Sequence, residues 1–265
     1  MLPYELIDKI LYNLNNTHIS IKLKRNYISN KLIKLNDITM DKEAKNGHLD
    51  VVKYLHSIGK KCTTWAMNYA SENGHLELVK YLHSIGKKCT TYAMNSASMK
   101  GHLEIVKYLH NIGYKCTNYA MDLASKYGYL ETIKYLHSIG KKCTTRAMDN
   151  ASMNGYLEIV KWLHENRKEG CTTYAMNSAS MNGHLEIVKW LHENRIEDCT
   201  NDAMDYISKN GHLEVVKYLC DNKYKYKCTN DAIDYASKNG HLEVVEYLKS
   251  RKFDTVNEQY SISFY

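Results

Sequence analysis

The chain has 265 residues, long enough to bury a sizeable core in one domain or two. One Pro and 13 Gly are too few for the many turns of a β-sandwich, so that class is a poor candidate. The formal net charge of +7 weakly favours acidic partners and carries no information about the fold.

The amino terminus does not have the pattern of a secretory signal. In MLPYELIDKILYNL, Pro3, Glu5 and Asp8 stand where a signal peptide would have a basic start and an apolar run. No stretch approaches the ~18 consecutive apolar residues that indicate a transmembrane helix. We therefore expect an intracellular, cytoplasmic protein without a membrane segment.

Residues 1–34 differ from the rest of the chain. Their opening follows the pattern LPxELxxxILxxL and resembles the start of an F-box, whereas the continuation, IKLKRNYISNKLIKL, lacks the tryptophan that F-boxes often carry. The resemblance implies that five positions contact the adaptor subunit of a cullin-type ubiquitin ligase: Leu2, Pro3, Leu6, Ile10 and Leu11. The alternative is a helical cap over the first unit of the repeat array that follows.

From about residue 35 to residue 251 the chain repeats itself, and residues 252–265 follow as a C-terminal tail. Eight glycines recur at steps of 27 to 29 residues: Gly47, Gly74, Gly101, Gly128, Gly155, Gly183, Gly211 and Gly240. Such a period is the signature of a repeat architecture, in which every unit has the same local structure.

One unit, residues 171–198, predicts a helix–turn–helix. Thr172 or Thr173 can cap a first helix, on which Ala175 and Ala179 fall in one buried stripe. Gly183 ends that helix, because glycine adopts the left-handed conformation without steric cost. The second helix has a wide apolar stripe: Leu185, Ile187, Val188, Trp190 and Leu191.

Neither helix can bury its apolar face alone, so neighbouring units must stack. Segments such as NGHLEIVKYLHSIG resemble the second half of an ankyrin repeat, and YAMNSAS stands in the place of its TPLHLAA. An ankyrin repeat has about 33 residues; the missing residues fall after KKCT, where ankyrins project a β-hairpin finger. The resemblance implies an all-α, ankyrin-type helix–turn–helix solenoid of about eight repeats, with an N-terminal helical cap and reduced or absent fingers.

Short repeats of this kind resemble the ankyrin proteins of giant DNA viruses, and the richness in Lys, Asn, Ile and Tyr fits an AT-rich genome. The resemblance therefore implies a non-catalytic scaffold for protein–protein interaction, one that can act in the cytoplasm of a host cell. We expect a monomer that binds a protein partner of unknown identity.

The loop after the second helix changes along the chain. In the earlier repeats a glycine closes this helix, as at Gly59 and Gly86. In three later repeats we expect Asn166, Asn194 and Asn222 to adopt the left-handed conformation instead.

Cysteine and histidine columns invite a metal or thiol interpretation. Seven cysteines occupy one position in successive repeats: Cys62, Cys89, Cys116, Cys143, Cys171, Cys199 and Cys228. Stacked helices lie roughly 8–10 Å apart, too far for disulfides or for one metal ion to gather ligands. We expect the cysteines to fill a recurrent core site and the histidines to stabilise turns and helix ends. We expect no catalytic, cofactor or metal site, and no enzyme.

A lysine column on the second helix, from Lys53 to Lys217, follows an acidic column by three residues, and we expect ion pairs between them. The loop lysines are less balanced: Lys60, Lys61, Lys87, Lys88, Lys141 and Lys142. They support the alternative function of binding nucleic acid or another acidic partner, although nucleic acid is the less favoured partner.

Positions that vary between repeats are the ones able to carry recognition. On the first helix they lie nine, five and two residues before the glycine, a stripe that should face away from the Ala/Met core. Aromatic, Met and Arg side chains there predict a partner-binding surface on the concave side: Trp65, Tyr69, Tyr92, Met99, Tyr119, Leu123, Arg146, Met153, Tyr174 and Met181. The alternative is that several of the tyrosines only cover seams between repeats.

Overall fold

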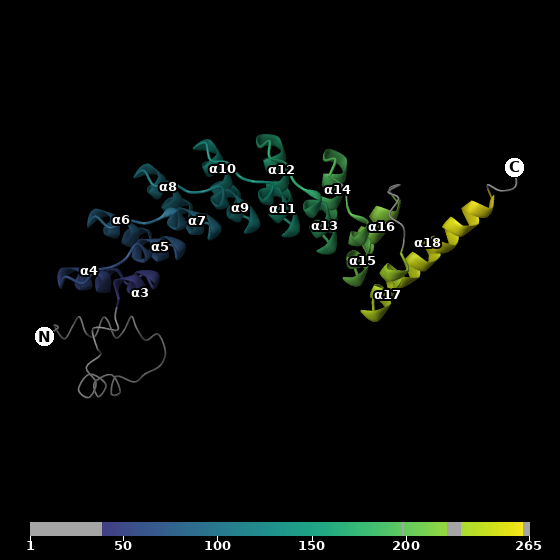
Figure 1. Ribbon diagram of the computed structural model, residues 1–265, viewed down its shortest axis with the longest axis horizontal. Helices are drawn as coiled ribbons and strands as arrows, with labels where there is room; N and C mark the ends of the chain where they lie inside the picture. The colour runs from purple at the N-terminus through teal and green to yellow at the C-terminus, as the bar shows by residue number, and fades with distance from the viewer. Residues whose placement is uncertain (1–38, 198, 222–228, 262–265) are drawn as a thin grey trace, which may run out of the picture. The chain divides into compact units, whose positions relative to one another are not determined.

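The computed structural model describes residues 39–197, 199–221 and 229–261, and within them every regular element is a helix (Figure 1). The helices alternate as eight pairs, which confirms the predicted all-α repeat fold. The predicted cap and the F-box-like positions Leu2, Pro3, Leu6, Ile10 and Leu11 lie outside the described residues.

The first helix of each pair, helix A, is short. The eight A helices are α3 (Met40–Lys45), α5 (Trp65–Glu72), α7 (Thr91–Met99), α9 (Tyr119–Lys126), α11 (Arg146–Met153), α13 (Thr173–Met181), α15 (Asn201–Lys209) and α17 (Asn230–Lys238).

The second helix, helix B, follows after a turn that contains the repeated glycine. The eight B helices are α4 (Leu49–Ser57), α6 (Leu76–Ser84), α8 (Leu103–Asn111), α10 (Leu130–Ser138), α12 (Leu157–Asn166), α14 (Leu185–Asn194), α16 (Leu213–Asp221) and α18 (Leu242–Ser261). Helix α18 continues beyond Arg251 into the segment predicted as a tail. No helix among the described residues is long and apolar enough to cross a membrane.

The repeated core is built from small side chains on helix A and branched ones on helix B. In the second pair Ala66, Met67 and Ala70 are fully buried, as are Val79 and Leu82 opposite them. Small alanines let neighbouring A helices pack closely, and each buried aliphatic side chain contributes roughly 1.5–3 kcal/mol. The predicted Ala/Met stripe is therefore confirmed.

The chain divides into two compact units, residues 1–120 and residues 121–265. Within the first unit α3 packs on α5 and α5 on α7; within the second α11 packs on α13 and α15 on α17. Each unit is thus held by contacts between neighbouring repeats, as expected for a solenoid.

A ladder of polar bonds joins helix A of one repeat to the start of helix A in the next. Asn68 accepts a hydrogen bond from the backbone N–H of Thr90 (3.0 Å) and donates one to its hydroxyl (3.2 Å). Asp149 accepts from both groups of Thr172, at 2.8 and 3.0 Å. The threonine in turn caps its helix, since Thr172 Oγ1 accepts from the N–H of Tyr174 (3.1 Å). This assigns the predicted cap to Thr172.

The Asn/Asp and Thr positions of this ladder were not singled out from the sequence. In four further pairs the backbone N–H of the threonine donates to the side chain of the Asn or Asp: Asp41–Thr63, Asn95–Thr117, Asp122–Thr144 and Asn177–Thr200. In a fifth pair the hydroxyl of Thr229 donates to Asp205. The invariable Asn or Asp after the core methionine or isoleucine was the available signal.

The loops from helix B to the next helix A are short. Six residues join α6 to α7, and no strand occurs among the described residues, so the fingers are reduced as predicted. The expectation for Asn166 and Asn194 is wrong, because they are the last residues of the right-handed helices α12 and α14. Their side-chain amides donate to the carbonyls of Trp162 and Trp190, and Asn222 lies outside the described residues. The left-handed residue of the first of these loops is instead Gly170, with φ of 72°.

Candidate functional site

On helix A, the side chains nine residues before the repeated glycine point into solvent in both units. Trp65, Tyr92 and Tyr119 in the first unit are 43%, 38% and 54% exposed, and Tyr174 in the second is 52% exposed. Arg146 is exposed as well. Each side chain directly precedes a buried alanine, because successive helical positions lie about 100° apart and only one of them can face the core.

In the first unit these side chains form an ordered cluster, which we call the aromatic patch: Trp65, Tyr69 and Tyr92. The rings of Trp65 and Tyr69 stack with centroids 5.0 Å apart, and Tyr92 meets Trp65 edge to face at 5.2 Å. Such pairs add about 0.5–1.5 kcal/mol each beyond burial. The patch is therefore held in one arrangement before any partner binds.

Charged groups border the aromatic patch. The ammonium of Lys45 lies 5.4 Å from the ring centroid of Tyr69, and the Tyr92 hydroxyl donates to Glu72 at 3.1 Å. Burial raises the pKa of Tyr92, and the bond to Glu72 raises it further. The hydroxyl consequently stays protonated and remains a donor at neutral pH.

The remaining predicted residues are half-buried and spread over both units. In the first unit Met99 is half-buried; in the second, Leu123, Met153 and Met181 are half-buried. Tyr174 donates to the sulfur of Met153 at 3.4 Å. The structure thus joins Trp65, Tyr69 and Tyr92 in one cluster and Met153 with Tyr174 in another.

The exposed stripe is narrower than predicted. Ser96 and Ser178 belong to its middle row, yet they are only 3% and 5% exposed. Each donates its hydroxyl to the backbone carbonyl four residues earlier, that of Tyr92 or Tyr174. A serine at this position turns back onto its own helix, whereas the larger Tyr69 extends to the surface.

The outer face of helix B carries the predicted ion pairs. Lys80 binds Glu77 and Lys134 binds Glu131, both at 2.7 Å, and four more repeats repeat the pair. Exposed pairs of this kind contribute roughly 0–1 kcal/mol each. Because each pair joins one cation to one anion, the pairs themselves add no net charge to the outer face of helix B.

Both histidine columns bind neighbouring repeats. The column after the glycine lies over the glycine of the preceding repeat, and Nε2 of His75 is 3.2 Å from the carbonyl oxygen of Lys45. In the column that closes helix B, His56 and His83 bond the hydroxyls of Tyr81 and Tyr108 at 3.0 and 2.9 Å. The bond of His75 to the last residue of α3 fits the expected role at helix ends, whereas the second column joins side chains of neighbouring repeats instead.

The cysteine column is less uniform than a core site. Cys143 and Cys171 are buried, but Cys62, Cys89 and two others are half-buried. Burial raises the pKa of Cys89 to about 12 and that of Cys143 to about 11. These thiols stay protonated at neutral pH, so neither is an activated nucleophile.

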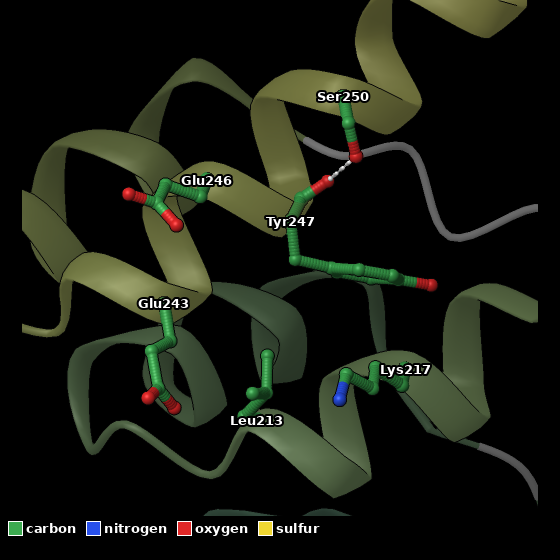
Figure 2. Close-up of a pocket in the computed structure, with 6 residues that line it drawn as sticks. All are labelled: Leu213, Lys217, Glu243, Glu246, Tyr247 and Ser250. Carbon is green, nitrogen blue, oxygen red and sulfur yellow. Dashed lines mark hydrogen bonds between the residues drawn. The ribbon is translucent and has the colours of Figure 1, made fainter.

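An open groove in the second unit lies between α16 and α18 (Figure 2). Its volume is about 560 Å³, and it is wide open to solvent. Lys217 and Leu213 line one side and Glu243, Glu246, Tyr247 and Ser250 the other, with the Ser250 hydroxyl donating to the Tyr247 carbonyl. No nucleophile stands beside a base here, and no three His, Cys, Asp or Glu side chains of the described residues gather as a metal site requires.

A family model described as ankyrin repeats (three copies) matches residues 67–147, 148–230 and 176–259. Among solved structures, the crystal structure of the human ASB11 ankyrin repeat domain is similar, with a TM-score of 0.54 and 17% sequence identity. That match covers 69% of this chain and 96% of that chain, and it bears on the fold alone. No curated protein matches the sequence. Since the family model spans well over half of its length, the chain belongs to the ankyrin repeat family.

Proposed function

We propose that this protein is a non-catalytic scaffold that captures a protein partner on the exposed face of its A helices. Ankyrin repeats are generally protein–protein interaction scaffolds. The observation that supports this placement is the aromatic patch, in which Trp65 and Tyr92 stay exposed although both pack against neighbouring rings.

Residue type and rigidity both favour the patch as the centre of an interface. Trp, Tyr and Arg are the residues most often found at energetic hot spots, and truncating one costs 2 kcal/mol or more. Side chains already fixed by ring contacts lose little entropy on binding. In the second unit, Arg146 and Tyr174 at the same helix position, with Met153 bonded to Tyr174, offer a further set of interface-type groups.

Alanine replacement tests the proposal. We expect Trp65→Ala, Tyr92→Ala, Tyr119→Ala and Tyr174→Ala together to abolish partner capture from eukaryotic cytosol while the helical circular dichroism signal stays unchanged. The matched control is Tyr127→Ala with Tyr129→Ala, which removes two exposed tyrosines outside the row. Capture that survives the fourfold change would refute the placement.

A role as substrate receptor of a cullin-type ubiquitin ligase is a second candidate, and the match of Leu2, Pro3 and Leu6 to an F-box supports it. The same capture experiment tests it with a chain that lacks residues 1–34. Recovery of the F-box adaptor by the full chain and not by the shortened one supports the ligase role. Failure of the full chain to recover the adaptor leaves residues 1–34 as a cap.

A further inference from the structure

The charges of the first unit are unevenly distributed between its two faces. Residues 39–120 contain eleven lysines and six acidic residues. Three lysines and three acids lie on the B helices, where Lys80 and Lys107 are paired with Glu77 and Glu104. The other eight lysines, on the A helices and loops, face only three carboxylates.

Those three carboxylates are already engaged. Asp41 accepts two hydrogen bonds from Thr63, buried Glu43 binds His48 at 2.6 Å, and Glu72 accepts from Tyr92. Among residues 39–120, the whole charge excess therefore belongs to the loops and the A helices.

Five of the lysines form what we call the loop-lysine row: Lys60, Lys61, Lys87, Lys88 and Lys115. None has an ion-pair partner among the described residues. Burial raises the pKa of Cys62, and Lys87 opposes that rise, which places the Lys87 charge beside the preceding loop. Lys87 thus lies near the loop that contains Lys60 and Lys61, and the five ammonium groups are available to an external anion.

The row runs alongside the exposed aromatic side chains. Lys61, Lys88 and Lys115 each precede one of them by four residues, namely Trp65, Tyr92 and Tyr119. Helices α5 and α7 begin at Trp65 and Thr91, beside these residues in the sequence, and their helix dipoles add positive potential there. A ligand that covers the aromatic patch therefore also meets the lysines.

We infer that the partner presents an extended acidic protein segment, whose carboxylates pair with the loop-lysine row while its apolar groups cover the aromatic patch. This inference rests on the proposed function, because it names the chemistry of the partner bound at that same surface.

The ring geometry favours protein over single-stranded nucleic acid as the occupant. Bases bind by stacking on open aromatic faces, but Trp65 and Tyr69 stack on each other and Lys45 lies over Tyr69. Residues 39–120 also contain no arginine, the side chain best suited to bidentate phosphate binding.

The repeat spacing sets the spacing of the carboxylates. Packed helices lie roughly 8–10 Å apart, and a polyproline chain advances about 3.1 Å per residue with three residues per turn, so every third side chain lies on one face. Three residues of the partner then span one repeat. The segment should carry Asp or Glu at every third position.

Selection from a random 12-residue peptide display library on the immobilised full chain tests the inference. We expect the selected peptides to be enriched in Asp and Glu with a period of three, and to bind less tightly as salt rises from 50 to 500 mM. Affinities of synthesised hits are then measured by fluorescence polarisation.

Two variants remove the same charge from different faces. Lys61→Gln, Lys88→Gln and Lys115→Gln together should weaken the hits about tenfold. Lys53→Gln, Lys80→Gln and Lys107→Gln on helix B should change affinity less than twofold. Equal weakening by both variants, or hits without acidic enrichment, would overturn the inference.

The remaining outcomes separate the inference from the proposed function. If the affinity of the selected peptides falls on Trp65→Ala with Tyr92→Ala but not in the loop-lysine variant, the acidic segment is refuted and the proposed aromatic binding surface is retained. Hits that are indifferent to Trp65→Ala with Tyr92→Ala refute both. A fluorescein-labelled 20-nucleotide single strand that binds more tightly than the peptides, and is lost in the loop variant, replaces the acidic segment with nucleic acid.

Discussion

The single position that most clearly joins one repeat to the next is the Asn or Asp that binds the following threonine. The side-chain amide of Asn68 accepts one hydrogen bond and donates another at this position, whereas the carboxylate of Asp149 accepts both. Burial raises the pKa of Asp122 and of Asp149, although the bonds from threonine oppose the rise. At neutral pH the charged carboxylate of an Asp at this position is therefore less stabilising than the neutral amide of an Asn.

Replacing Asp149 with Asn should stabilise the chain. A raised folded-state pKa means that the contribution of Asp149 is largest below its unfolded value of 3.8 and is lost as pH rises through the folded value. We expect Asp149→Asn to raise the free energy of unfolding by about 1 kcal/mol at pH 7, with the gain shrinking toward pH 4. Urea denaturation at both pH values measures it.

The reverse change supplies the control for this position. Asn68 is 1% exposed, so Asn68→Asp should lower the free energy of unfolding at pH 7 and recover part of the loss at pH 4. A gain from Asp149→Asn that does not depend on pH would contradict the electrostatic explanation.

The turn between helix A and helix B is also a contact between repeats. Gly74 has φ of 83°, and a Cβ there would lie 2.7 Å from Cε1 of His102 in the next repeat. Gly86 closes helix B with φ of 73°, but a Cβ there meets nothing within 4 Å. The two glycines thus share a left-handed backbone conformation, but a side chain of the next repeat lies over Gly74 and none lies over Gly86.

This difference predicts unequal costs for the same substitution. Gly86→Ala should lower the free energy of unfolding by about 1–2 kcal/mol, the cost of a left-handed alanine. Gly74→Ala should cost about 1–3 kcal/mol more, because it also displaces the ring of His102. Urea denaturation compares the two, and equal losses would show that the histidine contact is not a packing constraint.

Local structure was predictable from this sequence, and contacts between repeats were not. The period of the glycines placed both helices, the alanine stripe placed the core, and the spacing of Glu77 and Lys80 gave the ion pair. The bonds of His83 to Tyr108 and Asn68 to Thr90 join residues 25 and 22 positions apart. They depend on how one repeat is turned against the next, which the pattern inside one repeat does not specify.

The candidate surface was predicted in part for the same reason. Helical spacing identified the exposed row that contains Trp65, Tyr92 and Tyr174. It could not show that Ser96 turns back onto its own helix, nor that Trp65 stacks on Tyr69. Side-chain size and neighbouring rings decide those details, and both appear only once the repeats are packed.

Across the described repeats, the residues that hold neighbouring repeats together differ from those that we propose to bind a partner. Columns that recur in every repeat, such as the core alanines and the Thr caps, hold neighbours together, and in a solenoid such contacts add approximately along the chain. Helix B presents balanced ion pairs, while helix A and its loops present rings and unpaired lysines. We therefore propose that a partner binds on the side of helix A.

Site-specific photo-crosslinking tests this central claim most directly. Benzoylphenylalanine is placed in the full chain at Tyr92, Tyr119 or Tyr174 on helix A, or at Asn111 or Glu165 at the exposed ends of helix B. The account predicts crosslinks to the captured partner from the helix A positions and none from the helix B positions. Crosslinks from helix B alone would contradict it.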